Sequence, residues 1–290
     1  MSALTPTAPE QLVEVDGDVH LHPVYLAGSD YTGDPAFRPL NSLGVRTHHD
    51  GAGNYYAQTF DGKVRVGFIP EQDWDTLWKI AVHPDAFSAP AWVASFSEDT
   101  PTEIPAAVTR EIAAMYDADD DGWLHARTPA ALESLAPYAA AGWNLQMTSL
   151  GTLVADSPDG HAQITRRRIP LGADQREQDG QDGRHTLDVG TPREGWYGRF
   201  SSATPARILS AVATAMLNPA PAVRYRSALS PYARRTATIT PVLPPTPTPL
   251  DVHRALASRT RTAPLTVRSA PAAASLVWST ASPATAPARR

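Results

Sequence analysis

The sequence predicts an α+β protein made of two tandem copies of a mostly antiparallel sheet, each packed by a C-terminal helix, with a disordered tail after them. Three observations carry this prediction. Nearly the same strand-to-helix junction occurs twice, as FSEDTPTEIPAAV at 96–108 and FSSATPARILSAV at 200–212. An Asp-Gly hairpin signal precedes each junction, and the composition changes after residue 217.

Composition and repeats together predict four segments. They are a flexible N-terminus at 1–17, a first repeat at 18–118, a second repeat at 119–217 and a basic tail at 218–290. The chain up to residue 217 carries 15 basic and 29 acidic residues, whereas the tail carries ten arginines and one acid. Its proline, alanine, threonine and arginine composition does not supply a core, so the tail is predicted to be disordered.

The two hairpins are recognised by their turns. Residues 44–70 align with residues 142–170, which places Asp61-Gly62 opposite Asp159-Gly160. Asp-Gly between alternating segments is a strong hairpin signal, because glycine accepts the positive φ of a tight turn. Each repeat is therefore predicted to hold antiparallel strands around this turn.

The next strands in each repeat carry the predicted core. Trp92 and Phe96 lie on one face of the first strand, and Trp196 and Phe200 repeat that spacing in the second. Alternate residues of a strand share a face, so these four aromatic residues are expected to be buried.

Each tryptophan strand runs into a predicted helix. Thr100 and Thr204, each followed by proline, are expected to cap these helices, since a threonine oxygen accepts from a helical N–H and proline fits the first turn. Apolar residues then recur at helical spacing. A shorter helix is expected before each sheet, at 34–44 and 128–142.

These motifs resemble a known family. YLAGSDYTGDP, the turns TFDG (59–62) and SPDG (157–160), and a tryptophan strand running into F-S-x-x-T-P are similar to the tandem SPDY-type domain, a domain of unknown function found in Streptomyces and related actinomycetes. The resemblance covers about residues 20 to 217. It implies no established reaction, cofactor or catalytic residue.

An acidic stretch between the repeats resembles a calcium-binding loop. Asp117, Asp119 and Asp121 precede a glycine at the D-x-D-x-D-G spacing of such a loop. The twelfth position, however, is Thr128 and not the bidentate glutamate. A solvated acidic linker is the favoured interpretation, and weak calcium binding is the alternative.

A nucleic-acid surface is the second candidate site. Its residues are basic side chains and tyrosines in predicted strands: Arg166, Arg168, Arg199, Tyr55, Tyr56 and Tyr197. The negative net charge of the two repeats argues against a large duplex footprint. The basic tail could contact nucleic acid independently of the sheets.

The preferred function is a non-enzymatic tandem interaction module with a protein partner. The alternatives are a single-stranded nucleic-acid-binding protein and an unrecognised enzyme with a site between the repeats. No cofactor is predicted, because the sequence has no P-loop and no G-x-G-x-x-G motif. The absence of cysteine excludes disulfides. The N-terminus does not have the pattern of a signal peptide, so a cytoplasmic location is expected.

Overall fold

A computed structural model describes residues 17–30, 32–70, 76–118, 131–171, 175–191 and 193–242, together with residues 250, 253 and 254. The described residues up to Val242 belong to one compact unit, and those from Leu243 onward belong to a second. The first unit contains both repeats.

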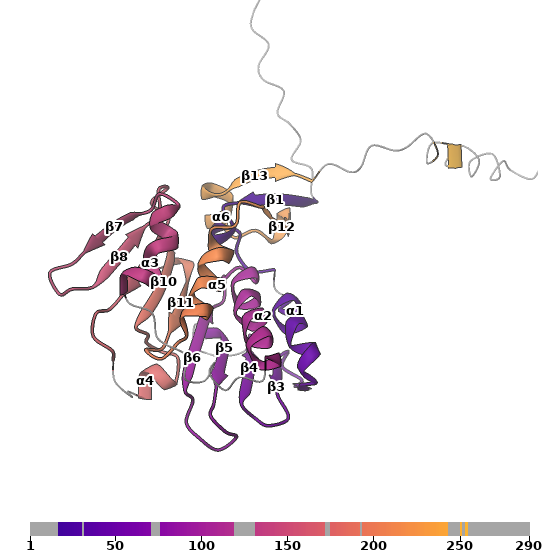
Figure 1. The fold of residues 1–290 in the computed structure, drawn as a ribbon. Helices are drawn as coiled ribbons and strands as arrows, with labels where there is room; N and C mark the ends of the chain where they lie inside the picture. Colours follow the sequence, from indigo (N-terminus) through magenta and orange to yellow (C-terminus); the bar gives the residue numbers. More distant parts are fainter. Residues whose placement is uncertain are drawn as a thin grey trace, which may run out of the picture. The chain divides into compact units, whose positions relative to one another are not determined.

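A ten-stranded antiparallel sheet runs through both repeats, in the order β2-β3-β4-β5-β6-β11-β10-β9-β8-β7 (Figure 1). The strands of the first half are β2 (Arg46–His49), β3 (Tyr55–Gln58), β4 (Val64–Phe68), β5 (Thr76–Val82) and β6 (Trp92–Ser97). The strands of the second half are β7 (Asn144–Met147), β8 (Leu153–Asp156), β9 (Ala162–Arg166), β10 (His185–Thr191) and β11 (Glu194–Phe200). Each repeat thus contributes five strands, and the two halves share one sheet.

The halves meet where β6 pairs with β11. Ser95 lies opposite Arg199, Phe96 opposite Gly198, and Ala94 opposite Phe200. Ser95 and Arg199 are the same position of the two repeats, 104 residues apart, as Trp92 and Trp196 are. The strand register therefore has an approximate twofold axis at the Ser95–Arg199 pair.

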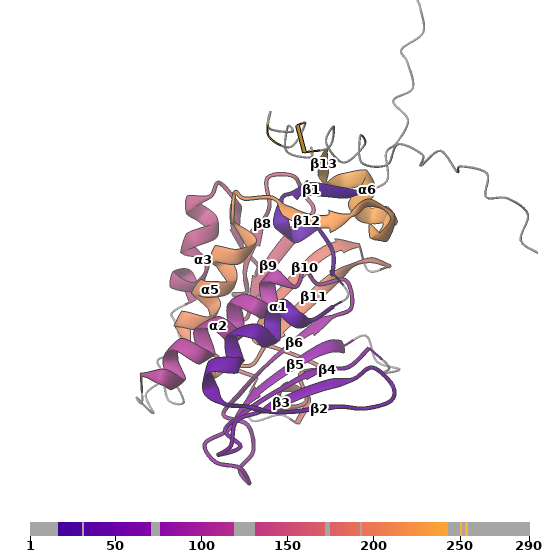
Figure 2. The same cartoon turned by 90° about the vertical axis from the view of Figure 1, so that its right-hand side faces the viewer.

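Helices cover one face of this sheet (Figure 2). In chain order they are α1 (Asp34–Phe37), the 3-10 helix η2 (Arg38–Leu43), α2 (Glu103–Asp117), α3 (Ala131–Ala140) and α5 (Ala206–Met216). A short helix, α4 (Gln175–Gln178), contacts β6. The apolar faces of the helices and the sheet form one hydrophobic core that includes Trp92, Phe96, Trp196 and Phe200, all buried.

The ordered part of the chain extends beyond the predicted start of the tail. Residues 218–242 form β12 (Ala222–Tyr225), the 3-10 helix η4 (Arg226–Ala228), α6 (Pro231–Thr236) and β13 (Thr238–Pro241). The predicted tail boundary at residue 218 is therefore wrong for these residues. The remainder of the predicted tail lies almost entirely outside the described residues, as does the predicted N-terminal segment except Gly17.

The chain's first strand also differs from its predicted place in the first repeat. β1 (Asp18–His22) leads into the 3-10 helix η1 (Val24–Leu26) and pairs with β12 on one side and β13 on the other. These three strands form a separate sheet in the order β12-β1-β13. Val19 and Leu21 pack there against Ala222, Leu229 and Ala233. The first and last strands of the first unit thus share a small core.

Neither predicted threonine cap forms. Helix α2 begins at Glu103 with Thr102 as its N-cap, and α5 begins at Ala206 with Pro205 as its N-cap; no side chain caps either helix. Thr100 and Thr204 are instead buried in the turns before the helices, where their N–H groups donate to the carbonyls of Ser97 and Ser201. Because each threonine is part of the turn before its helix, the helix begins later than predicted.

Candidate functional site

The SPDG turn of the second repeat is a hydrogen-bonded hairpin tip. Ser157 Oγ accepts from the N–H groups of His161 (3.1 Å) and Ala162 (2.8 Å) and donates to Asp159 Oδ1 (2.5 Å). The other oxygen of Asp159 accepts from the Tyr25 hydroxyl at 2.7 Å. Burial raises the pKa of Asp159, but these hydrogen bonds outweigh it and hold that pKa below its ordinary value.

The TFDG turn of the first repeat is built the same way. Thr59 Oγ1 accepts from the Val64 N–H (3.0 Å) and donates to Asp61 Oδ1 (2.6 Å). The Tyr116 hydroxyl donates to Asp61 Oδ2 at 3.0 Å. Gly62 follows at φ 73°, the left-handed conformation that the sequence predicted for this turn. Both Asp-Gly turns therefore tie a hairpin tip to a distant tyrosine, which is a structural role.

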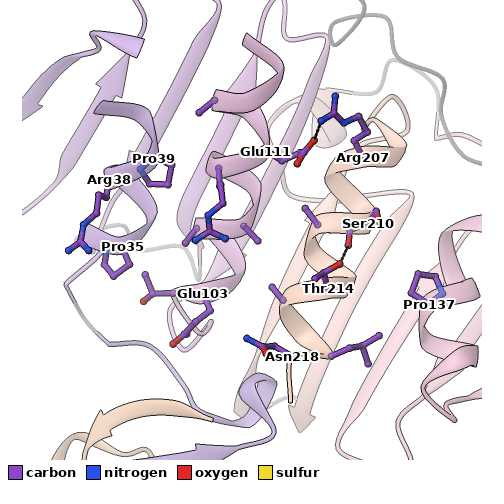
Figure 3. Close-up of a pocket in the computed structure, with 18 of the residues that line it drawn as sticks. Pro35, Arg38, Pro39, Glu103, Glu111, Pro137, Arg207, Ser210, Thr214 and Asn218 are labelled. Carbon is purple, nitrogen blue, oxygen red and sulfur yellow. Dashed lines mark hydrogen bonds and ion pairs between the residues drawn. The ribbon is translucent and has the colours of Figure 1, made fainter. Parts of the chain in front are cut away.

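A groove over the helix layer has a volume of about 1390 Å³ (Figure 3). Equivalent residues of the two repeats, 104 positions apart in the sequence, line it from the two long helices α2 and α5. The pairs are Glu103 and Arg207, Ala106 and Ser210, Ala107 and Ala211, Arg110 and Thr214, Glu111 and Ala215, and Ala113 and Leu217. The groove is therefore a product of the duplication.

Other elements complete the groove. Pro35, Arg38 and Pro39 line it from α1 and η2, and Pro137 lines it from α3. Figure 3 shows the first three on one side of the paired helices and Pro137 on the other. These short helices are the ones that precede the sheet in each repeat, so both walls also come from corresponding parts of the two copies.

The groove's carboxylates all have partners. Arg207 Nη2 lies 2.5 Å from Glu111 Oε1, an ion pair between α5 and α2 that is drawn in Figure 3. Glu103 is held by Arg224, and Asp30 Oδ1 accepts from the Thr102 hydroxyl at 2.5 Å. The acidic groups therefore serve in the protein's own contacts.

The structure divides the predicted nucleic-acid residues between the two faces of the sheet. Tyr56, Tyr197 and Arg199 lie on the face away from the long helices, because their neighbours along each strand point into the core. Arg199 Nη2 donates to Asp188 Oδ1 at 2.8 Å, and its guanidinium lies 4.6 Å from the centre of the Tyr197 ring. Arg199 and Tyr197 are thus engaged in internal contacts, whereas Tyr56 is exposed.

The remaining predicted residues are not on that face. Tyr55 faces the helices, where the centre of its ring lies 4.1 Å from the centre of the Phe37 ring. Arg166 is 1% exposed on the helix side, and burial lowers its pKa to about 10. Arg168 follows the end of β9 and is exposed. A buried arginine does not reach a phosphate backbone, so the six residues do not form one surface.

A buried histidine lies beside Arg166. His185 in β10 is paired across the sheet with Arg166 and with Phe200. Burial, together with the positive charges of Arg166 and Arg184, lowers the pKa of His185 to about 2. His185 is therefore a neutral core residue near pH 7.

The predicted calcium loop falls mostly outside the described residues: Asp119 and Asp121 are not described, and Asp117 ends α2. Within the described ranges, no group of three or more histidine or acidic side chains could hold a metal ion. In the same part of the chain, no helix has the length and apolar character needed to cross a membrane.

The fold defines a class of protein with an internally duplicated α+β domain. A family model matches each copy: the SPDY domain, a domain of unknown function (DUF317), at residues 59–118 and 156–222. Both segments that resemble the SPDY-type domain by their motifs are thus matched by its family model. Comparison with curated proteins and with solved structures gave no significant match.

Sequence reasoning missed the groove. Its signal is present, because alanine and serine occupy equivalent positions of two amphipathic helices, at 106–107 and 210–211. Those positions flank the apolar residues that face the sheet. What the sequence did not show is that α2 and α5 lie side by side, which follows from the β6–β11 pairing.

Proposed function

We propose that the protein is a non-enzymatic interaction module that receives a helical segment of a protein partner in the groove over α2 and α5. The observation that carries this proposal is the use of the same six positions of both long helices to line one groove. A groove floored by two packed helices is a recurring site for a third helix. Duplication supplies both sides of it.

The floor of the groove suits a closely approaching backbone. Ala106, Ala107, Ser210 and Ala211 present small side chains along it. Because none of these extends far from its helix, the larger side chains of a partner can fill the space between the walls. Proline side chains on both walls add rigid apolar surface.

The charges around the groove favour an acidic partner segment. Among the described residues, Arg38 and Arg110 form no ion pair, whereas Glu103 and Glu111 are paired with arginines of the same chain. Asp30, bonded to a hydroxyl, also forms no ion pair within the described residues, so the lining keeps one uncompensated positive charge on balance. Complementary charge on a partner contributes mainly to specificity and to the rate of association.

Selection of helical peptides on the purified full chain tests this proposal. We expect a displayed library of amphipathic helices to yield binders whose Kd rises at least tenfold in Ser210→Trp, because Ser210 is exposed and an indole at that position occupies the groove. Ala139→Trp is the matched control: it is an exposed position of α3 outside the groove. Failure to select any binder, or binders insensitive to Ser210→Trp, would overturn the proposal.

A second variant tests the charge preference. In Arg38→Gln/Arg110→Gln, selected peptides should lose their excess of acidic residues while still depending on Ser210. Peptides that keep the same acidic content against this variant would contradict the assigned role of the two arginines.

A further inference from the structure

The open face of the first half of the sheet, the face turned away from the long helices, concentrates positive charge. Its side chains alternate with the core residues of β2 to β5 and are Arg46, His48, Tyr56, Gln58, Arg65 and Lys79. The strands β2 to β6 contain no acidic residue, although residues 18–118 as a whole carry 6 basic and 14 acidic residues. Half of the basic residues of the first repeat therefore lie on this one face.

The second repeat provides an internal comparison. Strand registers make Asn144 the counterpart of Arg46, Gln163 of Arg65, and Thr186 of Lys79. In the same way Gln146 and Val154 occupy the places of His48 and Tyr56. The same fold thus forms with neutral residues at all of these positions. The cations and rings of the first half are not required by the sheet.

Aromatic groups lie among the cations. Tyr56 is 36% exposed and stacks with His48 at a centroid distance of 6.4 Å and an interplanar angle of 23°. At the end of the same face, the Arg46 guanidinium lies 4.8 Å from the centre of the Phe60 ring, which is 66% exposed. Exposed rings beside cations are the features that bind successive bases and phosphates of a single strand.

From these features we infer that the open face of the first half-sheet binds single-stranded nucleic acid. Arg46 and Lys79 contact phosphates, and Tyr56 and His48 provide a stacking surface. Arg65 Nη2 donates to the Ala86 carbonyl at 2.5 Å, so it contributes charge while fixed to the loop after β5. The inference is independent of the proposed peptide groove, which lies on the other side of the sheet.

The negative net charge of the repeats does not prevent this contact. At physiological ionic strength, exposed charges farther apart than about 8 Å are largely screened from each other. The cations on the face therefore dominate for a strand lying on it. The nearest carboxylates along the described chain, Asp50, Asp61 and Asp85, lie in turns and accept hydrogen bonds from residues of those turns. The same screening predicts binding that weakens steeply with salt.

Fluorescence anisotropy with labelled 20-nucleotide oligo(dT) and oligo(rU), titrated with the full chain at 20 to 200 mM NaCl, tests the inference. The test variant is Arg46→Asn/Lys79→Thr, which installs the residues of the second repeat. We expect its Kd at low salt to rise at least tenfold. The slope of log K against log salt should decrease in magnitude by about 1.4, because two phosphate contacts are lost and each contributes about 0.7 to the slope. The ring variant His48→Gln/Tyr56→Val should weaken binding without changing that slope.

Arg38→Gln/Arg110→Gln is the matched control, because it removes two positive charges from the helix side of the protein. It should bind as the wild type does. The inference is overturned if the wild type does not bind at 20 mM NaCl, or if binding is unchanged in the test variant. An equal loss in the control, or equally tight binding of a duplex or of poly-glutamate, overturns it as well. The two oligonucleotides distinguish DNA from RNA as the preferred strand.

Discussion

Ser95 and Arg199 face each other across the middle of the ten-stranded sheet and occupy the same position of the two repeats. Their pairing is what a symmetric dimer of one repeat would show if strand β6 of each copy paired with the other. The neighbouring pairs obey the same relation: Phe96 lies opposite Gly198, and Ala94 opposite Phe200. The sheet therefore has the geometry of two fused protomers.

This geometry predicts that a fragment of the first repeat without β1 and η1, residues 27–118, forms a homodimer. Without β11, the buried edge of β6 is exposed, and an open apolar edge readily pairs with another strand. Sedimentation velocity at micromolar concentration should give twice the monomer mass. A folded, monodisperse monomer would contradict the prediction.

Ser95→Pro in the same fragment is the control. The Val93 carbonyl accepts from the Ser201 N–H at 2.9 Å, so the backbone groups of Ser95, two residues further on, also point toward the seam. Proline removes one N–H from that edge, and the fragment should no longer dimerise.

A second prediction concerns Arg224, which ties the small sheet to helix α2. Its Nη1 and Nη2 donate to Glu103 at 2.9 and 2.6 Å, and its Nε and Nη2 donate to the Gly28 carbonyl. The Arg224 side chain is 6% exposed and that of Glu103 is 38% exposed. Because several charge-assisted hydrogen bonds are lost, Arg224→Gln should lower the free energy of unfolding by about 2 kcal/mol. Urea denaturation measures this.

Arg207→Gln is its matched control. The Arg207–Glu111 pair has one strongly exposed partner, so its loss should cost under about 1 kcal/mol. Equal effects of the two substitutions would show that the Arg224 contact does not hold the small sheet in place.

A third prediction compares two truncations. A chain ending at Val242 keeps every strand described here and should unfold at the temperature of the full chain. A chain ending at Leu217 loses both partners of β1 and should have a Tm several degrees lower, since Val19 and Leu21 lose their covering residues. Differential scanning calorimetry separates these cases. Equal Tm values for the two truncations would contradict the prediction.

The fourth prediction is a pH dependence from Asp159. Its pKa is below the ordinary value of 3.8 in the folded state, so its ionised form stabilises the fold above pH 3.8, and this stabilisation is lost as pH falls through the lowered pKa. Asp159→Asn should lower the free energy of unfolding by about 1 kcal/mol at pH 7, and by progressively less below pH 3.8. A constant deficit for Asp159→Asn at all pH values would disprove the electrostatic origin.

The fifth prediction concerns His185. Its folded pKa is about 2, far below the 6.5 of an ordinary histidine, so the unfolded chain gains a proton below pH 6.5 while the folded chain does not. The wild type should therefore lose up to about 1.4 kcal/mol of stability per pH unit below 6.5 relative to His185→Leu. Denaturation at pH 7.5 and 5.5 gives the comparison. Parallel pH slopes for the two proteins would show that His185 is accessible to protons.

The sequence predicted those parts of the fold that depend on local pattern. Period-two alternation located the strands around Asp61-Gly62 and Asp159-Gly160, and spacing of Trp92 and Trp196 located buried strands. Helical spacing located α2 and α5, although not their first residues, because the turns that bury Thr100 and Thr204 are fixed by the strands before them.

What the sequence could not supply depends on contacts between distant residues. The short elements between 218 and 242 are rich in proline and arginine, and they are ordered through β1 and Glu103, which lie about 120 to 220 residues away. Adjacent residues of a strand point to opposite faces of the sheet, so the alternation alone places Tyr55 and Tyr56 on different faces. The predicted nucleic-acid residues could therefore have been assigned to two faces from the sequence. Predicting the groove would have required knowing that β6 pairs with β11, because this pairing places α2 beside α5.

Alanine-methyl NMR of the full chain with a selected helical peptide tests the central claim most directly, because the groove is lined by Ala106, Ala107, Ala113, Ala211 and Ala215. The account predicts that the methyl resonances of these residues shift on titration, while those of Ala57 and Ala155, buried in β3 and β8 on the sheet, stay in place. Shifts confined to alanines outside the groove, with these five unchanged, would contradict it.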